Sequence, residues 1–210
     1  MSARNLLHLI FLLCMALSLN GCFGTTPPSR FYSLTPQEYH TVSFSNAPHV
    51  YVKIGPIAIP SYLDRRQIVT RTGRNEIVVS EYDLWGGSLE EEITQLLVGS
   101  LAEQLVPKGI VVIPWRSLPV QEGGTTYRIF VSVNRFDGTP GETAVLNAFW
   151  GLLQKKEKGE ETLLLQETTI TEVLNGKGYD SLVSAMGKIL DRLGKEIGGS
   201  ISSNLPSQCH

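Results

Sequence analysis

The sequence predicts a single α/β domain, in which a mixed β-sheet with an antiparallel meander carries two long amphipathic helices. Two observations lead to this class. Short segments alternate apolar and polar residues, as half-buried strands do, and two longer segments repeat apolar residues at helical spacing. The order is strands, a helix, a strand, three neighbouring strands with short turns, and a final helix.

The first half of the domain is expected to begin with four short strands. They are predicted at residues 30–34, 49–54, 67–70 and 76–79. The dipeptide Gly55-Pro56 and then Pro60 are expected to end or bend the second strand. Residues 72–75 have the composition of a hairpin turn between the last two strands.

The first helix is expected to open at Ser88. Glu91 stands three residues later, the spacing of a capping box in which each side chain bonds the other's free backbone N–H. Pro107 and Gly109 are expected to end the helix. One apolar stripe runs along it: Leu89, Ile93, Leu96, Leu97, Leu101 and Leu105.

The second half is expected to hold four strands and the second helix. The strands are predicted at residues 110–113, 127–134, 143–153 and 163–173, with a turn marked by Asp137-Gly138 and Pro140-Gly141 and a charged tip at residues 155–160. Residues 175–178 turn into the last helix. Its apolar stripe consists of Leu182, Met186, Ile189, Leu190, Leu193, Ile197 and Ile201.

The amino terminus has the form of a secretory signal. Arg4 precedes an apolar run over residues 6–19, and Gly21 stands directly before Cys22. This ending resembles the lipobox of bacterial lipoproteins, which implies cleavage between Gly21 and Cys22 and acylation of the Cys22 thiol, a nucleophile that serine would replace poorly. The alternative is an ordinary secretory signal that happens to end near a cysteine.

The lipobox divides the chain into four parts. Residues 1–21 form the signal peptide, residues 22–29 the acylated cysteine and a short tether, residues 30–204 the domain, and residues 205–210 a loose tail. Acyl chains would hold the protein on a membrane without spanning it. Because Phe23 follows the cysteine instead of aspartate, resemblance to enteric sorting signals places it on the periplasmic side of the outer membrane.

Charge and cysteine content narrow the function classes. Removing residues 1–21 from the 210-residue chain leaves 17 basic and 20 acidic side chains, so no positive footprint for nucleic acid is present. Cys14 leaves with the signal and Cys22 carries lipid, so no intramolecular disulfide is expected. Cys209 is expected to be a free thiol, with an intermolecular bridge as the alternative.

The sequence contains no catalytic or metal-binding pattern, and no cofactor is implied. The histidines of the mature chain, His40, His49 and His210, are scattered without ligand spacing. Ser88 lacks the surroundings of a nucleophile elbow and is expected to cap a helix. The acidic residues 90–92 suit the first turn of that helix. A periplasmic hydrolase has only the fold class in its favour.

Residues 52–71 carry a longer pattern. A hydrophobic strand is followed by proline, by Tyr62-Leu63-Asp64-Arg65, and then by a Gln-Ile-Val strand. With this pattern, the chain resembles the ABC-type transport auxiliary lipoproteins, the PqiC-like proteins, over nearly its whole mature length. Further matches follow in order along the chain: Phe31-Tyr32-Ser33-Leu34, Trp85, Phe136-Asp137-Gly138, Trp150 and Ser184-Ala185-Met186.

The resemblance implies a fold similar to the amino-terminal domain of TolB. It also implies that the chain accompanies a transporter with mammalian-cell-entry (MCE) domains, as an outer-membrane docking piece in intermembrane lipid transport and envelope integrity. A homo-oligomer is left open. The alternative function is a structural or assembly lipoprotein of the envelope with a different partner.

Five residues are candidates for docking this partner. They flank turns or follow the family pattern instead of continuing a buried stripe: Tyr62, Arg65, Arg66, Tyr82 and Trp85. Core packing is the alternative for the aromatic residues, most of all for Trp85. For Asp64 and Arg65 we expect a structural role in the turn, where an aspartate bonds nearby backbone N–H groups.

Overall fold

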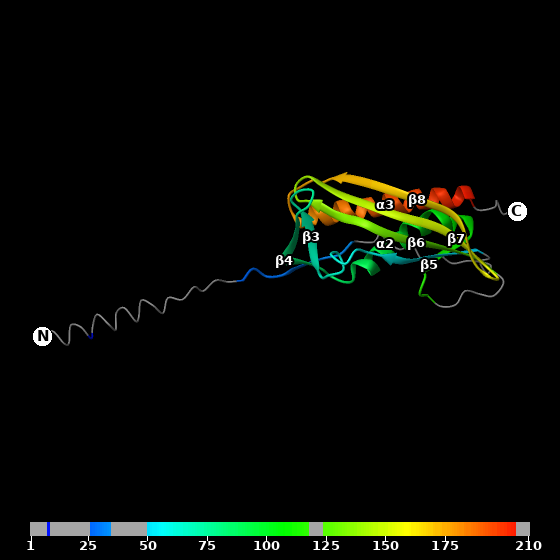
Figure 1. Ribbon diagram of the computed structural model, residues 1–210, viewed down its shortest axis with the longest axis horizontal. Helices are drawn as coiled ribbons and strands as arrows, with labels where there is room; N and C mark the ends of the chain where they lie inside the picture. Colours follow the sequence, from blue (N-terminus) through cyan, green and yellow to red (C-terminus); the bar gives the residue numbers. More distant parts are fainter. Residues whose placement is uncertain (1–7, 9–25, 35–49, 118–123, 205–210) are drawn as a thin grey trace.

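The computed structural model describes residues 8, 26–34, 50–117 and 124–204 (Figure 1). The predicted lipid-attachment and cleavage residues, the three histidines of the mature chain, Cys209 and the predicted loose tail lie outside these residues. The predicted class is confirmed: one α/β domain holds mixed sheets and two long helices. The strands divide, however, into two sheets instead of one.

The larger sheet has five strands in the order β5-β2-β6-β7-β8. Strand β2 lies parallel to both β5 and β6, and β6, β7 and β8 form the predicted antiparallel meander. The strands of this sheet are β2 (Val50–Ala58), β5 (Ile110–Pro114), β6 (Thr125–Thr139), β7 (Thr143–Lys156) and β8 (Gly159–Val173).

The strands of this sheet are longer than the sequence predicted. Strand β2 does not end at Gly55-Pro56: the pairing with β6 shifts between Ile54 and Ile57 and continues to Ala58. The predicted turn is confirmed at Pro140-Gly141, but Asp137 and Gly138 lie inside β6 and pair with Val145 and Ala144. Local turn chemistry gives way here to continuous pairing with a neighbouring strand.

The smaller sheet has three strands in the order β1-β4-β3. These are β1 (Arg30–Tyr32), β3 (Gln67–Arg71) and β4 (Ile77–Trp85). Strand β1 pairs parallel to the end of β4, and β3 and β4 form the predicted hairpin. Strand β4 runs six residues beyond the predicted end at Val79, because the parallel pairing with β1 continues to Trp85.

The two helices, α2 (Leu89–Leu105) and α3 (Tyr179–Asn204), pack against each other and against the large sheet. A short 3-10 turn, η1 (Val106–Lys108), follows α2 and ends at Gly109, whose φ of 75° suits glycine. The predicted capping box is absent, since the Ser88 side chain makes no cap hydrogen bond. Glu92 instead accepts a hydrogen bond of 2.6 Å from the backbone N–H of Leu34.

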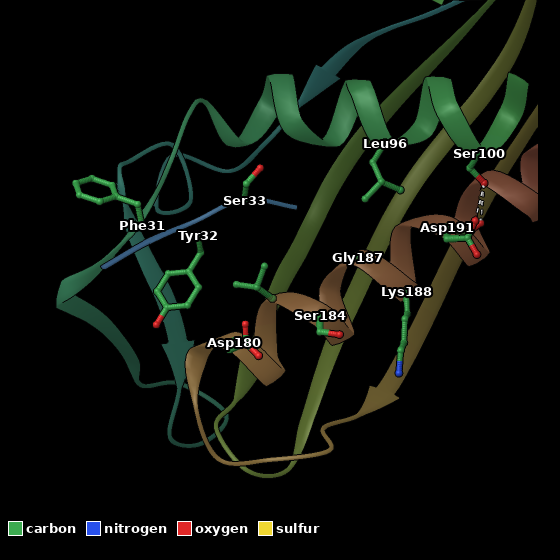
Figure 2. Close-up of a pocket in the computed structure, with 11 residues that line it drawn as sticks. Phe31, Tyr32, Ser33, Leu96, Ser100, Asp180, Ser184, Gly187, Lys188 and Asp191 are labelled. Carbon is green, nitrogen blue, oxygen red and sulfur yellow. Dashed lines mark hydrogen bonds between the residues drawn. The ribbon is translucent and has the colours of Figure 1, made fainter. Parts of the chain in front are cut away.

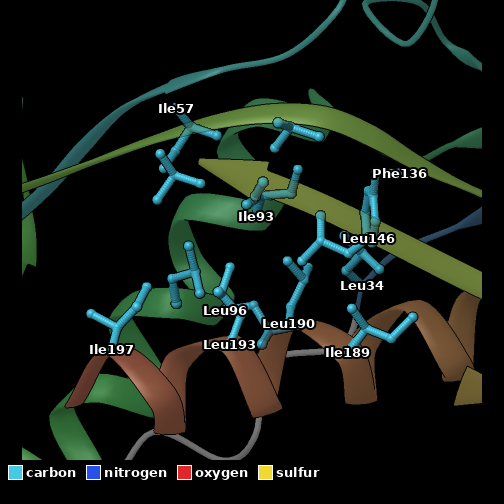
Figure 3. Close-up of a cluster of buried hydrophobic side chains, with 14 of the residues drawn as sticks. Leu34, Ile57, Ile93, Leu96, Phe136, Leu146, Ile189, Leu190, Leu193 and Ile197 are labelled. Atoms are coloured by element: carbon cyan, nitrogen blue, oxygen red, sulfur yellow. The ribbon is translucent and has the colours of Figure 1, made fainter. Parts of the chain in front are cut away.

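Both helices bury the predicted stripes, and the core lies between helices and sheets (Figure 3). Neither helix is clearly amphipathic, however. Outside its buried positions, α2 still carries the half-buried apolar residues Val98 and Ala102, and α3 carries Gly187 and Gly199. The polar face that the sequence suggested is therefore interrupted by small and apolar residues.

The helices approach closely where α3 carries glycine. A Cβ placed on Gly194 would lie 2.5 Å from the Ser100 Oγ. The Ser100 hydroxyl donates to the Asp191 backbone oxygen at 3.1 Å, and Gln104 Nε2 donates to the Gly194 oxygen at 3.2 Å. Because Gly194 has no side chain, the backbone of α3 comes close enough to accept hydrogen bonds from polar side chains of α2.

We expect Gly194→Ala to destabilise the fold by about 1–3 kcal/mol, because the added methyl group collides with Ser100 across a packed interface. Gly199→Ala is the matched control on the same helix: its Cβ meets nothing within 4 Å, so it should gain up to about 1 kcal/mol from helix propensity. Urea unfolding of both variants checks this, and equal midpoints would contradict the close approach.

Candidate functional site

The family-like segment runs from β2 through a loop into β3, which places it between the two sheets. The loop is closed by its backbone: the N–H groups of Leu63 and Asp64 donate to the Pro60 oxygen at 2.9 and 3.3 Å. The Asp64 carboxylate is exposed and makes no hydrogen bond in the described structure. The prediction that this carboxylate holds the turn is therefore wrong.

The carboxylate that holds this region is Asp137 on β6, which is fully buried. Its oxygens accept from Arg71 Nε at 2.8 Å and from Arg135 Nε at 2.7 Å. The Tyr62 hydroxyl donates to the same carboxylate at 3.3 Å. These contacts join the loop, β3 and β6, and so fasten the small sheet to the large one.

The electrostatics of this cluster favour charged arginine and neutral tyrosine. The hydrogen bond to Asp137 raises the pKa of Arg71 above its ordinary value. Burial, and then the negative charge of Asp137, raise the pKa of Tyr62. The Arg71 guanidinium also lies 5.9 Å from the centre of the Tyr62 ring. Tyr62 is thus half-buried against the core and held by this cluster.

Arg65 and Arg66 lie on the exposed side of the same loop. The Arg66 guanidinium lies 5.9 Å from the centre of the Phe31 ring on β1, and the Arg66 backbone oxygen accepts from Trp85 N–H at 2.6 Å. Arg65 makes no ion pair in the described part of the chain. Both side chains remain available to an outside partner.

The remaining two docking candidates lie on β4. Trp85 is 3% exposed and packs in the core, so its side chain cannot meet a partner, and the core alternative applies to it. Tyr82 is half-buried, as Tyr62 is, and its hydroxyl donates to Glu81 at 2.8 Å. The structure thus brings Tyr62, Arg65, Arg66 and Trp85 around one loop, with Tyr82 further back along β4.

A groove of about 610 Å³ opens beside β1, between this strand and the two helices (Figure 2). Apolar residues of α2 and α3, among them Leu96, line it together with Phe31 and Tyr32. Asp180, Lys188 and Asp191 supply charge along α3. Its mixed apolar and polar lining suits contact with a polypeptide or another amphipathic group.

Sequence reasoning missed the Asp137 cluster and the bond between Glu92 and Leu34. Asp137 was treated as a turn residue because glycine follows it. A signal was present: Arg135 stands two residues before Asp137, a spacing that puts both side chains on one face of a continuing strand. The Glu92 contact had no local signal, since Leu34 lies 58 residues earlier in the chain.

Within the described ranges, no group of three or more His, Cys, Asp or Glu residues is placed to hold a metal ion. Every buried side-chain nitrogen or oxygen there has a hydrogen-bond partner. None of the described helices combines the length and the hydrophobicity needed to cross a membrane.

The model of the ABC-type transport auxiliary lipoprotein component family matches residues 32–198. The chain belongs to this family. The match begins in β1 and ends in α3, so it covers both sheets and the cluster around Asp137. The family consists of transport auxiliary lipoproteins and is not a family of known enzymes.

Among characterised relatives, the chain is similar to the intermembrane transport lipoprotein PqiC of Escherichia coli K12. The two are 24% identical over 174 residues, 83% of this chain and 87% of the relative. The Shigella flexneri protein of the same name matches equally. A crystal structure of an uncharacterized protein shares the fold with a TM-score of 0.65 at 20% identity, covering 83% of this chain and 99% of that one.

A second crystal structure, of a protein from Xanthomonas campestris, has a TM-score of 0.61 at 14% identity. It covers 84% of this chain and 100% of the other. At these identities the two structures support the fold alone. They show that the arrangement of two sheets and two helices occurs in proteins of very different sequence.

We expect Asp137→Ala to destabilise the protein by about 3 kcal/mol, because two arginines lose a buried partner. This loss of stability is at the lower end of the range for breaking a buried ion pair, because the Arg135 side chain is 38% exposed and partly solvated. Asp64→Ala, at an exposed carboxylate, should stay within about 0.5 kcal/mol of the parent. Thermal unfolding measures both; similar losses would show that Asp137 is not the central contact.

Proposed function

We propose that this auxiliary lipoprotein is anchored by acylated Cys22 to the periplasmic face of the outer membrane. There it docks a transporter with MCE domains and serves intermembrane lipid transport and envelope integrity. The observation that carries the proposal is the family match, together with the similarity to PqiC, whose name describes an intermembrane transport lipoprotein.

Sequence and structure support a docking role. The lipobox at Gly21 and Cys22 gives a membrane attachment, and only a short tether separates it from β1. Of the docking candidates, Arg65, Arg66 and Tyr82 keep exposed surface, whereas Tyr62 is tied to Asp137 and Trp85 is buried. We propose docking through Tyr82 on β4, with the domain acting as an oligomer.

Replacing Cys22 by serine tests the anchor. The variant should fail to incorporate radiolabelled palmitate and should appear as an unprocessed or soluble periplasmic form, because the hydroxyl does not replace the thiol in the lipid-transfer step. Cys209→Ser is the matched control and should fractionate with the outer membrane as the parent does. A Cys22→Ser protein that still labels and still fractionates there would overturn the anchor.

Binding to the transporter tests docking. The full chain, extracted from membranes in detergent, should retain the periplasmic part of its cognate MCE protein in a pull-down, and light scattering should give a mass above that of one chain. Tyr82→Ala should weaken this binding without lowering the unfolding temperature, because its half-buried ring lies outside the hydrophobic core. A monomer with no affinity for the MCE protein would favour the envelope lipoprotein with a different partner.

A further inference from the structure

Exposed apolar side chains gather on the small sheet. Eight large hydrophobic residues are exposed in the described structure, and four of them lie on β1 and β4. Phe31 is 58% exposed, and Ile77, Val78 and Val79 are each close to 40% exposed. The small sheet forms one end of the elongated domain, the end where the described chain begins (Figure 1).

The exposure of three consecutive residues has a structural cause. Successive residues of a strand point to opposite faces, so Ile77, Val78 and Val79 expose both faces of β4. Strand β1 pairs only with residues 83–85, so among the described residues this part of β4 has a neighbour, β3, on one side alone. The outer edge of β4 at Ile77–Val79 is therefore apolar and is not paired by any described strand.

Two arginines border the Phe31 end of this apolar surface. Phe31 pairs with Leu84, so Ile77–Val79 lie five to seven residues, about 17–23 Å, further along β4. Arg66 lies with its guanidinium 5.9 Å from the centre of the exposed Phe31 ring, and Arg65 is exposed beside it. A guanidinium can form two parallel hydrogen bonds to one phosphate while its stem and an aromatic neighbour stay in apolar surroundings. Arginine next to exposed aromatic and aliphatic side chains is the composition of surfaces that lie against phospholipid headgroups.

The length of the tether decides which part of the domain meets a membrane. Seven residues, 23–29, lie between Cys22 and Arg30 at the start of β1. Fully extended, the eight steps from Cys22 to Arg30 span at most about 29 Å. Strand β7, with 14 residues, is about 46 Å long on its own. The tether is shorter than the domain, so the small-sheet end lies nearest to the anchor.

We infer that Phe31, Arg65, Arg66 and the segment Ile77–Val79 form a surface that rests on the phospholipid headgroups of the membrane holding the anchor. This inference rests on the proposed acylation of Cys22. The backbone groups along β4 that no described strand pairs keep the contact at headgroup depth, because the hydrocarbon interior would leave them unbonded. The contact orients the domain, with the β7–β8 turn directed away from the membrane. It assigns Arg65 and Arg66 to lipid phosphate and leaves Tyr82 for the transporter.

The test uses the full acylated chain carrying Cys209→Ser, reconstituted in vesicles of phosphatidylethanolamine and phosphatidylglycerol. Val78→Cys places an environment-sensitive fluorophore on the proposed surface, and Lys158→Cys places the same fluorophore at the β7–β8 turn. We expect the fluorophore at position 78 to shift to shorter wavelength and to be quenched by headgroup-region nitroxide lipids. The fluorophore at position 158 should show neither change.

Charge variants then distinguish binding of lipid phosphate by the arginines from mere closeness of position 78 to the membrane. Replacing Arg65 or Arg66 by glutamine should lower the ratio of membrane-contacting to free orientations by about fivefold for each arginine removed. The matched lysine variants keep the charge and should retain most of the contact. Equal quenching at positions 78 and 158, or glutamine variants that quench like the parent, would overturn the inference.

Two further outcomes are distinguished by the same samples. If the reconstituted chain does not float with the vesicles, the anchor itself fails, which concerns the proposed function. If it floats but the fluorophore at position 78 responds only when the periplasmic part of the MCE protein is added, a protein strand occupies the β4 edge and the lipid contact is wrong.

Discussion

The buried carboxylate of Asp137 is the contact on which the relation between the two sheets depends. The small sheet, β1-β4-β3, has three strands and does not enclose a core of its own, so contacts with the large sheet must fix its position. Arg71 on β3, Arg135 on β6 and Tyr62 in the preceding loop converge on this one group. A buried charge with three hydrogen-bond donors fixes an arrangement that apolar packing would leave free to slide.

The helical layer is fixed in a comparable way by small residues. Gly194 and Gly198 on α3 let α2 approach so closely that Ser100 and Gln104 bond across the interface. With α2 held against α3, the N-terminal turn of α2 is also held, and Glu92 can bind the backbone after β1. The segment that follows the tether is therefore fastened to a helix as well as to β4.

Because of these constraints, the two ends of the elongated domain differ in structure. The tether, the small sheet and the exposed loop of Arg65 and Arg66 occupy one end, and the β7–β8 turn occupies the other. A lipoprotein of a transport system needs such a difference if one end lies against the membrane and the rest of the domain receives a partner. The family match runs from β1 into α3, so it covers both sheets and both helices.

Sequence alone determined the α/β class, the two helices, the meander and the family resemblance, because periodicity and local motifs encode which face each element buries. It also predicts the lipobox at Gly21 and Cys22, a pattern that depends on neighbouring residues alone. Tertiary structure decided the rest. Strand β2 continues past Pro56, Asp137 lies within a strand, and Trp85 is buried. The carboxylate of Asp137 accepts a hydrogen bond from Arg71, which lies 66 residues earlier in the chain, whereas Asp64 makes no such contact in the described structure. These features depend on contacts between residues far apart in the sequence, which form only when the chain folds, so no local pattern specifies them.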